Sequence, residues 1–346
     1  RSLALVLHAV ASLFVTAIAL RLFRNGLIAL VAGAVSVIHP AGLFAAHEGL
    51  SESAFVALAA AGTLLLLTHL PASFTQASAE ERLMRRSSFG ILFGFLLLGL
   101  SCLVRANFVL WIIFFAASYG LVVLRRRSLG ALALLAVGGL LFTLPPLTWA
   151  ARNYELCGHF PAFSALRGQT FYGGNNIVVA RDKAFWGYWV FPNQIPGETP
   201  MVELAQSMTE YEVDCYYYER GKRFVRENAR AMPVLLVGKL VRAYVPIPWG
   251  RSFPSYASNA FRLVFMLAAI HGLVFFWRRT DARYLWLMGS MVATSVATVL
   301  VFYGYSRFAY TVEIFFIPFV SAGVCRVIWK SYCGPALESE SSTFKR

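Results

Sequence analysis

The chain has 346 residues, of which 58% are hydrophobic and only 14% are charged. A soluble domain of this size has about 25% charged residues, so the composition excludes an ordinary soluble protein and indicates an integral membrane protein. The formal net charge of +14 would suggest a nucleic-acid partner in a soluble protein. We expect none here, because no Lys/Arg-rich helix stands outside an apolar context.

Nine segments are apolar and long enough to cross a bilayer, which takes about 20 residues in a helix. In chain order they are Ser2–Leu20, Leu27–Ala46, Ser53–Leu70, Ser88–Val104, Phe108–Leu124, Leu129–Ala151, Ala257–Trp277, Tyr284–Phe302 and Phe308–Ile328. We therefore predict an all-α polytopic membrane protein of about nine transmembrane helices, with six in residues 1–151 and three in residues 257–330.

Lys and Arg residues in short loops mark the cytoplasmic side of a membrane protein. One set of span ends carries fifteen of them, including Arg125, Arg126 and Arg127, whereas the alternate set carries only Arg105 and Arg307. This bias predicts that residues 152–256 form one large mixed non-cytoplasmic loop, with an interfacial helix near 233–245. Residues 331–346 are expected to form a disordered cytoplasmic tail.

Two further features concern the ends and the cysteines. The chain begins with Arg1 and enters an apolar run at once, which we interpret as a fragment whose N-terminal part is missing. Cys157 and Cys215 both fall in the predicted outer loop, where a disulfide and two unpaired thiols are both open.

Charged and amide side chains gather where the predicted spans reach the non-cytoplasmic face, although charge at membrane depth is costly. They are His47, Glu48 and Glu52; Arg105 and Asn107; Arg152 and Asn153; and Arg307 with Glu313. Each has a structural alternative. The arginines can snorkel to the interface, Glu52 can stabilise the start of its own helix, His47 can be a polar rim residue, and Glu313 can pair with an Arg.

Arginines at this face suit the phosphate of a lipid carrier, because guanidinium groups bind phosphate in a bidentate manner. A carboxylate can orient or deprotonate an acceptor hydroxyl, so Glu52 and Glu48 are the candidate catalytic residues. Arg105, Asn107, Arg152, Asn153, Arg307 and Glu313 are candidate substrate-binding residues. We predict no metal site, although His47 beside Glu48 leaves a divalent ion open.

The outer loop contains the run Gly173, Gly174, Asn175 and Asn176. Glycines permit close backbone approach, and Asn side chains can hydrogen-bond to sugar hydroxyls. We count these four residues as candidate substrate-binding residues, with a simple turn as the alternative.

Four stretches resemble the membrane-embedded glycosyltransferases of the GT-C class, and most closely bacterial relatives of the protein O-mannosyltransferases and the lipid A aminoarabinose transferases. They are His39-Pro40 with Ser51-Glu52; Leu103-Val104-Arg105-Ala106-Asn107; Pro145-Pro146 with Arg152-Asn153-Tyr154, Gly158, Gly168 and Gly173–Asn176; and Tyr305-Ser306-Arg307-Phe308 with Glu313 and Pro318. The likeness runs from about residue 1 to residue 328.

The resemblance implies sugar transfer from a polyprenyl-phosphate donor, with inversion, to a glycan, lipid or protein acceptor. It also implies an active site on the periplasmic or extracellular face of a bacterial inner membrane. By this likeness Glu52 matches the family's second outer-loop acid, and Arg105 and Arg307 face the lipid phosphate. The family's principal catalytic Asp has no match here, so we expect it upstream of residue 1 and this chain alone to be inactive.

Two other functions stay open from the sequence. One is a transporter or flippase of lipid-linked glycans, which would show internal repeats and helices broken at mid-membrane. The other is a non-catalytic membrane scaffold that uses its outer loop for protein contacts.

Overall fold

The computed structural model describes residues 1–70, 77–158, 166–247 and 253–333, and these residues form helices and irregular segments with no strand. The elements are α1 (Ser2–Phe23), α2 (Gly26–Val37), α3 (Pro40–His47), α4 (Glu52–His69), α5 (Ala77–Val104), η1 (Ala106–Val109), α6 (Leu110–Phe115), η2 (Ala116–Gly120), α7 (Leu121–Arg125), α8 (Leu129–Cys157), α9 (Arg167–Gly173), α10 (Ile177–Arg181), η3 (Pro192–Gln194), α11 (Met201–Leu204), α12 (Glu210–Glu227), α13 (Met232–Tyr244), α14 (Phe253–Phe276), η4 (Trp277–Arg279), α15 (Ala282–Val301), α16 (Ser306–Glu313), η5 (Ile314–Phe316) and α17 (Ile317–Cys333). The predicted tail lies outside the described residues from Gly334 onward.

Seven helical stretches in the described residues are long and apolar enough to cross a membrane. They are Ser2–Phe23, Glu52–His69, Ala106–Arg125, Leu129–Leu156, Ser255–Arg279, Ala282–Val301 and Ser306–Trp329. The predicted second span is a pair of helices, α2 and α3, bent by 48° at Ile38 and His39. The predicted fourth span, Ser88–Val104, is a shorter apolar stretch within α5. Each predicted span therefore coincides with helix, but seven helices, or eight with the bent pair, meet the criterion for a span.

The bend between α2 and α3 has a local cause. Pro40 occupies the first turn of α3, where its missing N–H is tolerated, but it forces the preceding residue out of the helical conformation. His39 accordingly has φ −59° and ψ 118°. The bend places the His39 side chain inside the bundle, where its exposed fraction is 0%.

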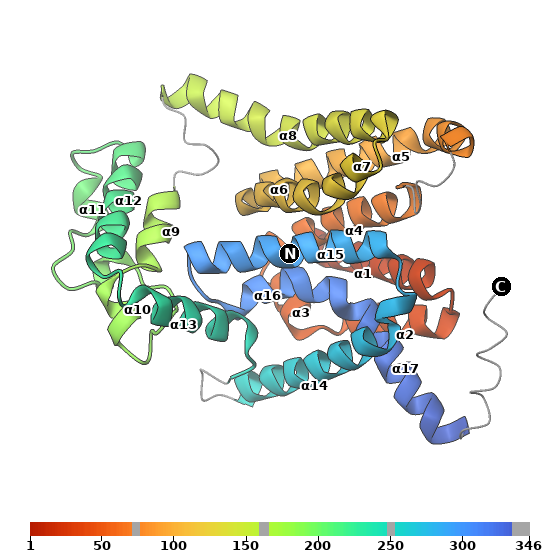
Figure 1. The fold of residues 1–346 in the computed structure, drawn as a ribbon. Coiled ribbons are helices and arrows are strands. Elements are labelled where there is room, and N and C mark those ends of the chain that lie inside the picture. The colour runs from red at the N-terminus through yellow and green to blue at the C-terminus, as the bar shows by residue number, and fades with distance from the viewer. Residues whose placement is uncertain (71–76, 159–165, 248–252, 334–346) are drawn as a thin grey trace.

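The long helices pack into one bundle and alternate in direction (Figure 1). The connections α1–α2, α7–α8 and α14–α15 lie at one end of this bundle, and they carry Arg24, Arg125–Arg127 and Arg278–Arg279. The start of α16 and the turn at η1 lie at the opposite end. The two sets of junctions that the sequence distinguishes by charge are therefore separated in space.

Close backbone approach holds several of these helices together. Gly99 of α5 lies against the Phe142 carbonyl of α8, and Gly272 of α14 lies against the Phe319 carbonyl of α17. A Cβ atom at either position would clash with main-chain atoms. Small residues serve the same purpose in other membrane helix bundles, where contact without a side chain increases van der Waals packing.

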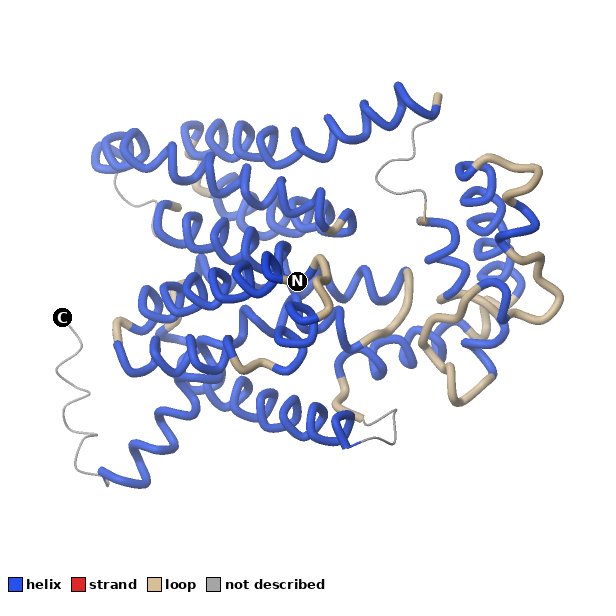
Figure 2. The backbone as a smooth tube through the Cα atoms, turned by 180° about the vertical axis from the view of Figure 1, so that it is seen from behind, coloured by secondary structure: helices blue, strands red, loops and turns tan. Residues whose placement is uncertain are grey.

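Residues 167–244 (α9 to α13) form a separate unit beyond the ends of the bundle helices, as both views show (Figures 1 and 2). This α9–α13 unit has its own apolar core, built from residues such as Val179, Val213 and Tyr217. The sequence predicts a loop of mixed structure here. The described part of this loop contains helices and irregular segments but no strand. A capping box of Thr209 and Glu212 begins its longest helix, α12. Cys215 is a free thiol.

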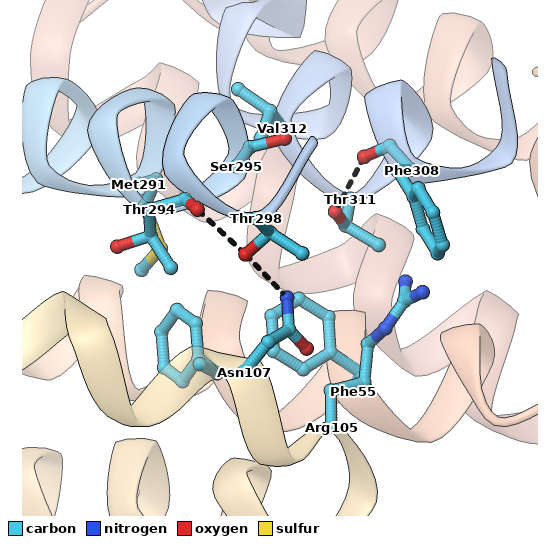
Figure 3. Close-up of a pocket in the computed structure, with 11 residues that line it drawn as sticks. Phe55, Arg105, Asn107, Met291, Thr294, Ser295, Thr298, Phe308, Thr311 and Val312 are labelled. Atoms are coloured by element: carbon cyan, nitrogen blue, oxygen red, sulfur yellow. Dashed lines mark hydrogen bonds between the residues drawn. The ribbon is translucent and has the colours of Figure 1, made fainter. Parts of the chain in front are cut away.

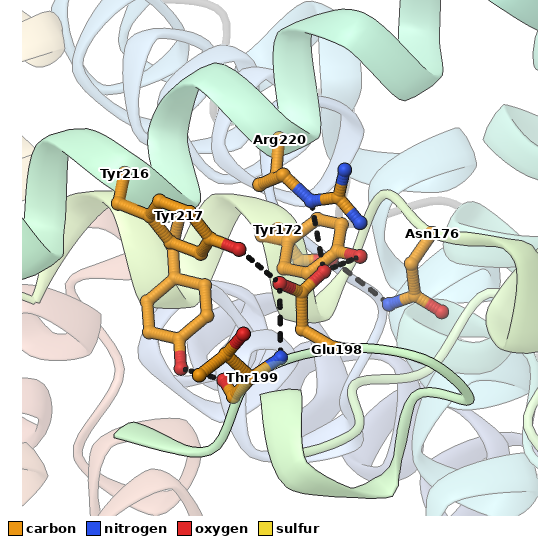
Figure 4. Close-up of polar contacts among 7 residues, drawn as sticks. All are labelled: Tyr172, Asn176, Glu198, Thr199, Tyr216, Tyr217 and Arg220. Carbon is orange, nitrogen blue, oxygen red and sulfur yellow. Dashed lines mark hydrogen bonds and ion pairs between the residues drawn. The ribbon is translucent and has the colours of Figure 1, made fainter. Parts of the chain in front are cut away.

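Glu198 ties the α9–α13 unit together (Figure 4). Its carboxylate accepts hydrogen bonds from the Tyr172 hydroxyl at 2.5 Å, the Tyr216 hydroxyl at 2.8 Å and Arg220 Nε at 2.9 Å. Burial alone would raise the pKa of Glu198, but these hydrogen bonds and the charge of Arg220 bring it below its ordinary value. Glu198 thus links α9 to α12 as a carboxylate.

Glu198→Gln should therefore loosen the α9–α13 unit. The loss of charge-assisted hydrogen bonds is expected to reduce the free energy of local opening by on the order of 2 kcal/mol, measured by hydrogen exchange of α9 and α12 amides. Since the folded pKa lies below the unfolded value, the stabilisation is complete above about pH 4.3 and is lost as the pH falls further. The variant should lack this pH dependence. The exposed Glu203→Gln is the control, and equal protection in both variants would contradict the assignment.

The orientation can be tested with two single cysteines in a variant that lacks the native ones. Arg126→Cys lies between α7 and α8, and Lys183→Cys lies in the α9–α13 unit. We expect a membrane-impermeant maleimide to label only position 183 from the non-cytoplasmic side and only position 126 from the cytoplasmic side. Labelling of both from one side would overturn the orientation.

Candidate functional site

Three charged side chains from separate helix junctions meet at the bundle end that faces the α9–α13 unit. Glu52 is the first residue of α4, Arg105 lies between α5 and η1, and Arg307 is in the first turn of α16. Glu52 Oε1 is 3.6 Å from Arg105 Nη2 and forms an ion pair with Arg307 Nε. We call these three residues the Glu52 cluster. One carboxylate faces two guanidinium groups, so the cluster carries a formal surplus of one positive charge.

The members of the Glu52 cluster differ in their access to solvent. The side chain of Glu52 is 0% exposed, that of Arg105 is 10% exposed and that of Arg307 is 36% exposed. Arg105 is packed between aromatic rings, with its Cζ atom 5.9 Å from the Phe55 ring centre and 5.2 Å from that of Phe308. Its Nη1 atom is buried and has no hydrogen-bond partner among the described residues. Arg105 therefore has a donor free for a further acceptor.

Two neighbouring cavities lie beside this cluster. The inner one, of about 20 Å³, is lined by Arg105 together with polar groups such as Ser295 (Figure 3). The outer one, of about 310 Å³, lies between the bundle and the α9–α13 unit. Its lining residues are Ala106, Asn107, Val109, Leu166, Arg167, Thr170, Thr298, Phe302, Tyr303 and Phe308. That volume is at the lower end of the range for ligand pockets, about 300–1,000 Å³.

Asn107 separates the two cavities and lines both. Its Nδ2 donates to the Thr298 hydroxyl at 3.0 Å, and that hydroxyl donates to the Thr294 carbonyl at 2.8 Å (Figure 3). Tyr303 lines the outer cavity, and burial raises its pKa against the opposing charge of Arg307. Its phenol therefore stays protonated at neutral pH and can donate a hydrogen bond.

Four of the predicted site residues lie on the surface. Glu48 pairs with His47 at 3.8 Å, and both side chains are well exposed. The Arg152 guanidinium lies 4.8 Å from the Trp149 ring centre and contacts Asn153 at 3.4 Å, near the end of α8. Within the described residues, the structure records no contact between these four and the Glu52 cluster. The structure thus does not bring these four residues to the Glu52 cluster, and their part in the site remains a prediction.

The Gly–Gly–Asn–Asn run docks the α9–α13 unit on the bundle. A Cβ on Gly174 would clash with the Phe302 carbonyl, and one on Gly173 would clash with the Trp189 ring. Asn175 donates to the carbonyls of Phe171 at 2.8 Å and Val301 at 3.0 Å. Asn176 caps α10. Both Asn side chains are buried and engaged within the protein, so the structure gives this run a docking role.

Glu313 lies at the opposite end of α16 from Arg307 and belongs to a different cluster. It pairs with Arg262 of α14 at 2.9 Å and with His39 at 3.4 Å. Glu313 therefore pairs with an Arg, as its structural alternative predicts.

Two buried cations, Arg262 and Lys239, are not among the predicted site residues. Arg262 lies five residues inside the predicted span Ala257–Trp277, and a charge at that depth already indicates an oppositely charged partner. Lys239 interrupts an apolar helix and is fully buried. Its Nζ donates to Asn175 Oδ1 at 2.8 Å and to the Leu300 carbonyl at 3.1 Å. Lys239 thus fastens α13 to the end of α15.

No group of three or more His, Cys, Asp and Glu side chains in the described part of the chain could hold a metal ion. His47 has only Glu48 beside it as an ionic partner. The geometry therefore gives no support to the divalent ion that the sequence left open at His47.

The chain was compared with known protein families, with curated proteins and with solved structures, and none of them matches it. The function is therefore inferred from the geometry of the site and from the sequence motifs.

Lys239→Met tests the fastening of α13. Burial lowers the pKa of Lys239 to about 7, whereas an unfolded Lys has a pKa near 10.4. Between these values the unfolded protein binds more protons, so the free energy of unfolding should rise with pH. The variant should lack this rise, measured as the melting temperature in detergent at several pH values between 7 and 10. The exposed Lys183→Met should keep it. Parallel profiles for the wild type and Lys239→Met would contradict the prediction.

Proposed function

We propose that the protein is a membrane-embedded glycosyltransferase that moves a sugar from a polyprenyl-phosphate donor to an acceptor. The observation that carries the proposal is the Glu52 cluster, with its surplus positive charge and the spare Nη1 donor of Arg105 beside a cavity. A buried surplus charge favours an anionic ligand, and guanidinium groups are suited to phosphate. The motifs that resemble the GT-C class support the same function.

The chemistry divides among the residues as follows. Arg307 is the more exposed cation and meets the donor phosphate first, and Arg105 adds its free donor. Their charge stabilises the phosphate that leaves with the electron pair of the broken glycosidic bond. The sugar occupies the outer cavity, where Asn107 and Tyr303 offer hydrogen bonds. The acceptor oxygen attacks the anomeric carbon from the opposite side, which inverts its configuration.

Glu52 is best suited to positioning the two arginines. Its carboxylate is fully buried and faces both guanidinium groups, so it has no route to an acceptor hydroxyl. The base that takes the acceptor proton is therefore a different group. The predicted catalytic role of Glu48, an exposed carboxylate between α3 and α4, remains a prediction.

The finer topology belongs to the same proposal. Counting the bent pair α2–α3 and the apolar part of α5 gives nine crossings, which would place the two ends of the chain on opposite sides. The Arg-rich connections at one end of the bundle support a cytoplasmic location for that end. The α9–α13 unit and the Glu52 cluster would then face the periplasm or the cell exterior.

Substitution in the Glu52 cluster tests the function. Arg307→Ala should reduce sugar transfer at least about a hundredfold, which is typical for loss of one group that stabilises developing charge. Glu52→Gln should also reduce transfer, because the two arginines lose the carboxylate that positions them. The assay uses the full-length protein in membranes and measures transfer from a panel of polyprenyl-phosphate-linked sugars to endogenous acceptors. Glu203→Gln and Arg181→Ala make the same chemical changes at exposed sites of the α9–α13 unit and should leave transfer unchanged.

Other outcomes separate the alternative functions. Transfer at the parental rate in both cluster variants would overturn the proposal. Movement of the lipid-linked sugar between leaflets without transfer would identify a flippase. A purified protein that binds no polyprenyl phosphate would indicate a scaffold.

A further inference from the structure

A second charged cluster lies inside the bundle, at the C-terminal end of α16. Glu313 accepts a hydrogen bond from Arg262 Nε at 2.9 Å through Oε1, and its Oε2 lies 3.4 Å from His39 Nε2. The exposed fractions of the whole residues are 8% for Glu313, 5% for Arg262 and 0% for His39. Arg262 also donates to the Ala243 carbonyl of α13 at 3.0 Å. These three residues, the Glu313 cluster, thus come from α16, α14 and the α2–α3 bend, and they contact a fourth element, α13.

The two clusters are joined by one short rigid element. Helix α16 contains eight residues, with Arg307 in its first turn and Glu313 as its last residue. A rise of 1.5 Å per residue separates these two Cα atoms by about 9 Å. An irregular stretch containing Tyr303 and Gly304 precedes α16, and the 3₁₀ turn η5 follows it. Through η5, α16 continues into α17 as one helical stretch, Ser306–Trp329, so the two clusters lie on the same helical element.

Other titratable groups surround His39 and Glu313. Tyr310 of α16 lies with its ring centre 5.0 Å from that of His39, and its hydroxyl is 3.4 Å from His8 Nδ1 of α1. Tyr244 of α13, bonded to Ser295, also faces Glu313. The rings of Phe261 and Phe265 enclose His39 edge-on.

We propose that the Glu313 cluster positions Arg307 on Glu52. A buried carboxylate that loses its cation is strongly destabilised, so Glu313 stays with Arg262 and fixes the C-terminal end of α16. His39 contacts Glu313 through Oε2 and so ties the same end of α16 to the α2–α3 bend.

The consequence for sugar transfer rests on the function proposed above, since it concerns how firmly Arg307 is held where the phosphate would bind. The coupling between the two clusters does not depend on that function. It is a property of α16 and can be measured without a substrate.

Hydrogen exchange of the α16 amides, with the protein in lipid nanodiscs, tests the coupling. Glu313→Gln should increase exchange about tenfold along α16, including its first turn around Arg307, because the buried ion pair is lost. Glu48→Gln is the matched control: it removes a carboxylate that is also paired with a His, but on the surface, and should leave α16 unchanged. Unchanged exchange in Glu313→Gln would overturn the proposal.

His39 gives a second, milder variant. His39→Leu keeps the Glu313–Arg262 pair and removes only the contact at Glu313 Oε2, in a site enclosed by aromatic rings. It should also increase exchange in the first turn of α16, by a smaller factor than Glu313→Gln.

Exchange that increases only beside Glu313, and not in the first turn of α16, would contradict the coupling. His39→Leu also answers the question if Glu313→Gln fails to fold. Coupled exchange in a protein that transfers no sugar would refute only the proposed function.

Discussion

An ionised side chain inside an apolar helix bundle is retained only if an opposite charge reaches it. The described part of the bundle contains two such carboxylates, Glu52 and Glu313, and in each case the required arginine comes from a different part of the chain. The ion pairs thus determine where α4, α14 and α16 meet. The irregular points of the bundle, at the α2–α3 bend and at Arg105, lie where a charged or polar side chain has to be turned inward. The breaks in the helices thus allow these side chains to be buried beside their charged partners.

The sequence predicts the membrane-spanning character well, because apolar segments of about 20 residues have few alternatives in a folded chain. Each predicted span coincides with helix. The bend at His39 has a local signal in Pro40, but the burial of the His39 side chain depends on neighbours distant in sequence. The helical content of the α9–α13 unit is also not evident, although Thr209 and Glu212 are a local signal for the start of α12.

For the candidate site, charge at span ends correctly brings together Glu52, Arg105 and Arg307. It does not distinguish them from Glu48 and Arg152, which have other contacts, because a position near one membrane face does not specify a position around the bundle. The buried partners of Glu313 and Asn175 follow only from the packing of α14 and α13. In sequence terms, Arg262 and Lys239 are isolated cations in apolar helices, and their partners lie 51 and 64 residues away.

The α9–α13 unit has an apolar core of its own and reaches the bundle mainly through Lys239, Asn175 and the end of α15. Such a division separates two kinds of evolutionary change. Substitutions and insertions in α10, α11 and α12 can alter the outer surface, while the charged groups of the bundle remain in place. The attachment of α13 to α15 is the part that such divergence has to preserve.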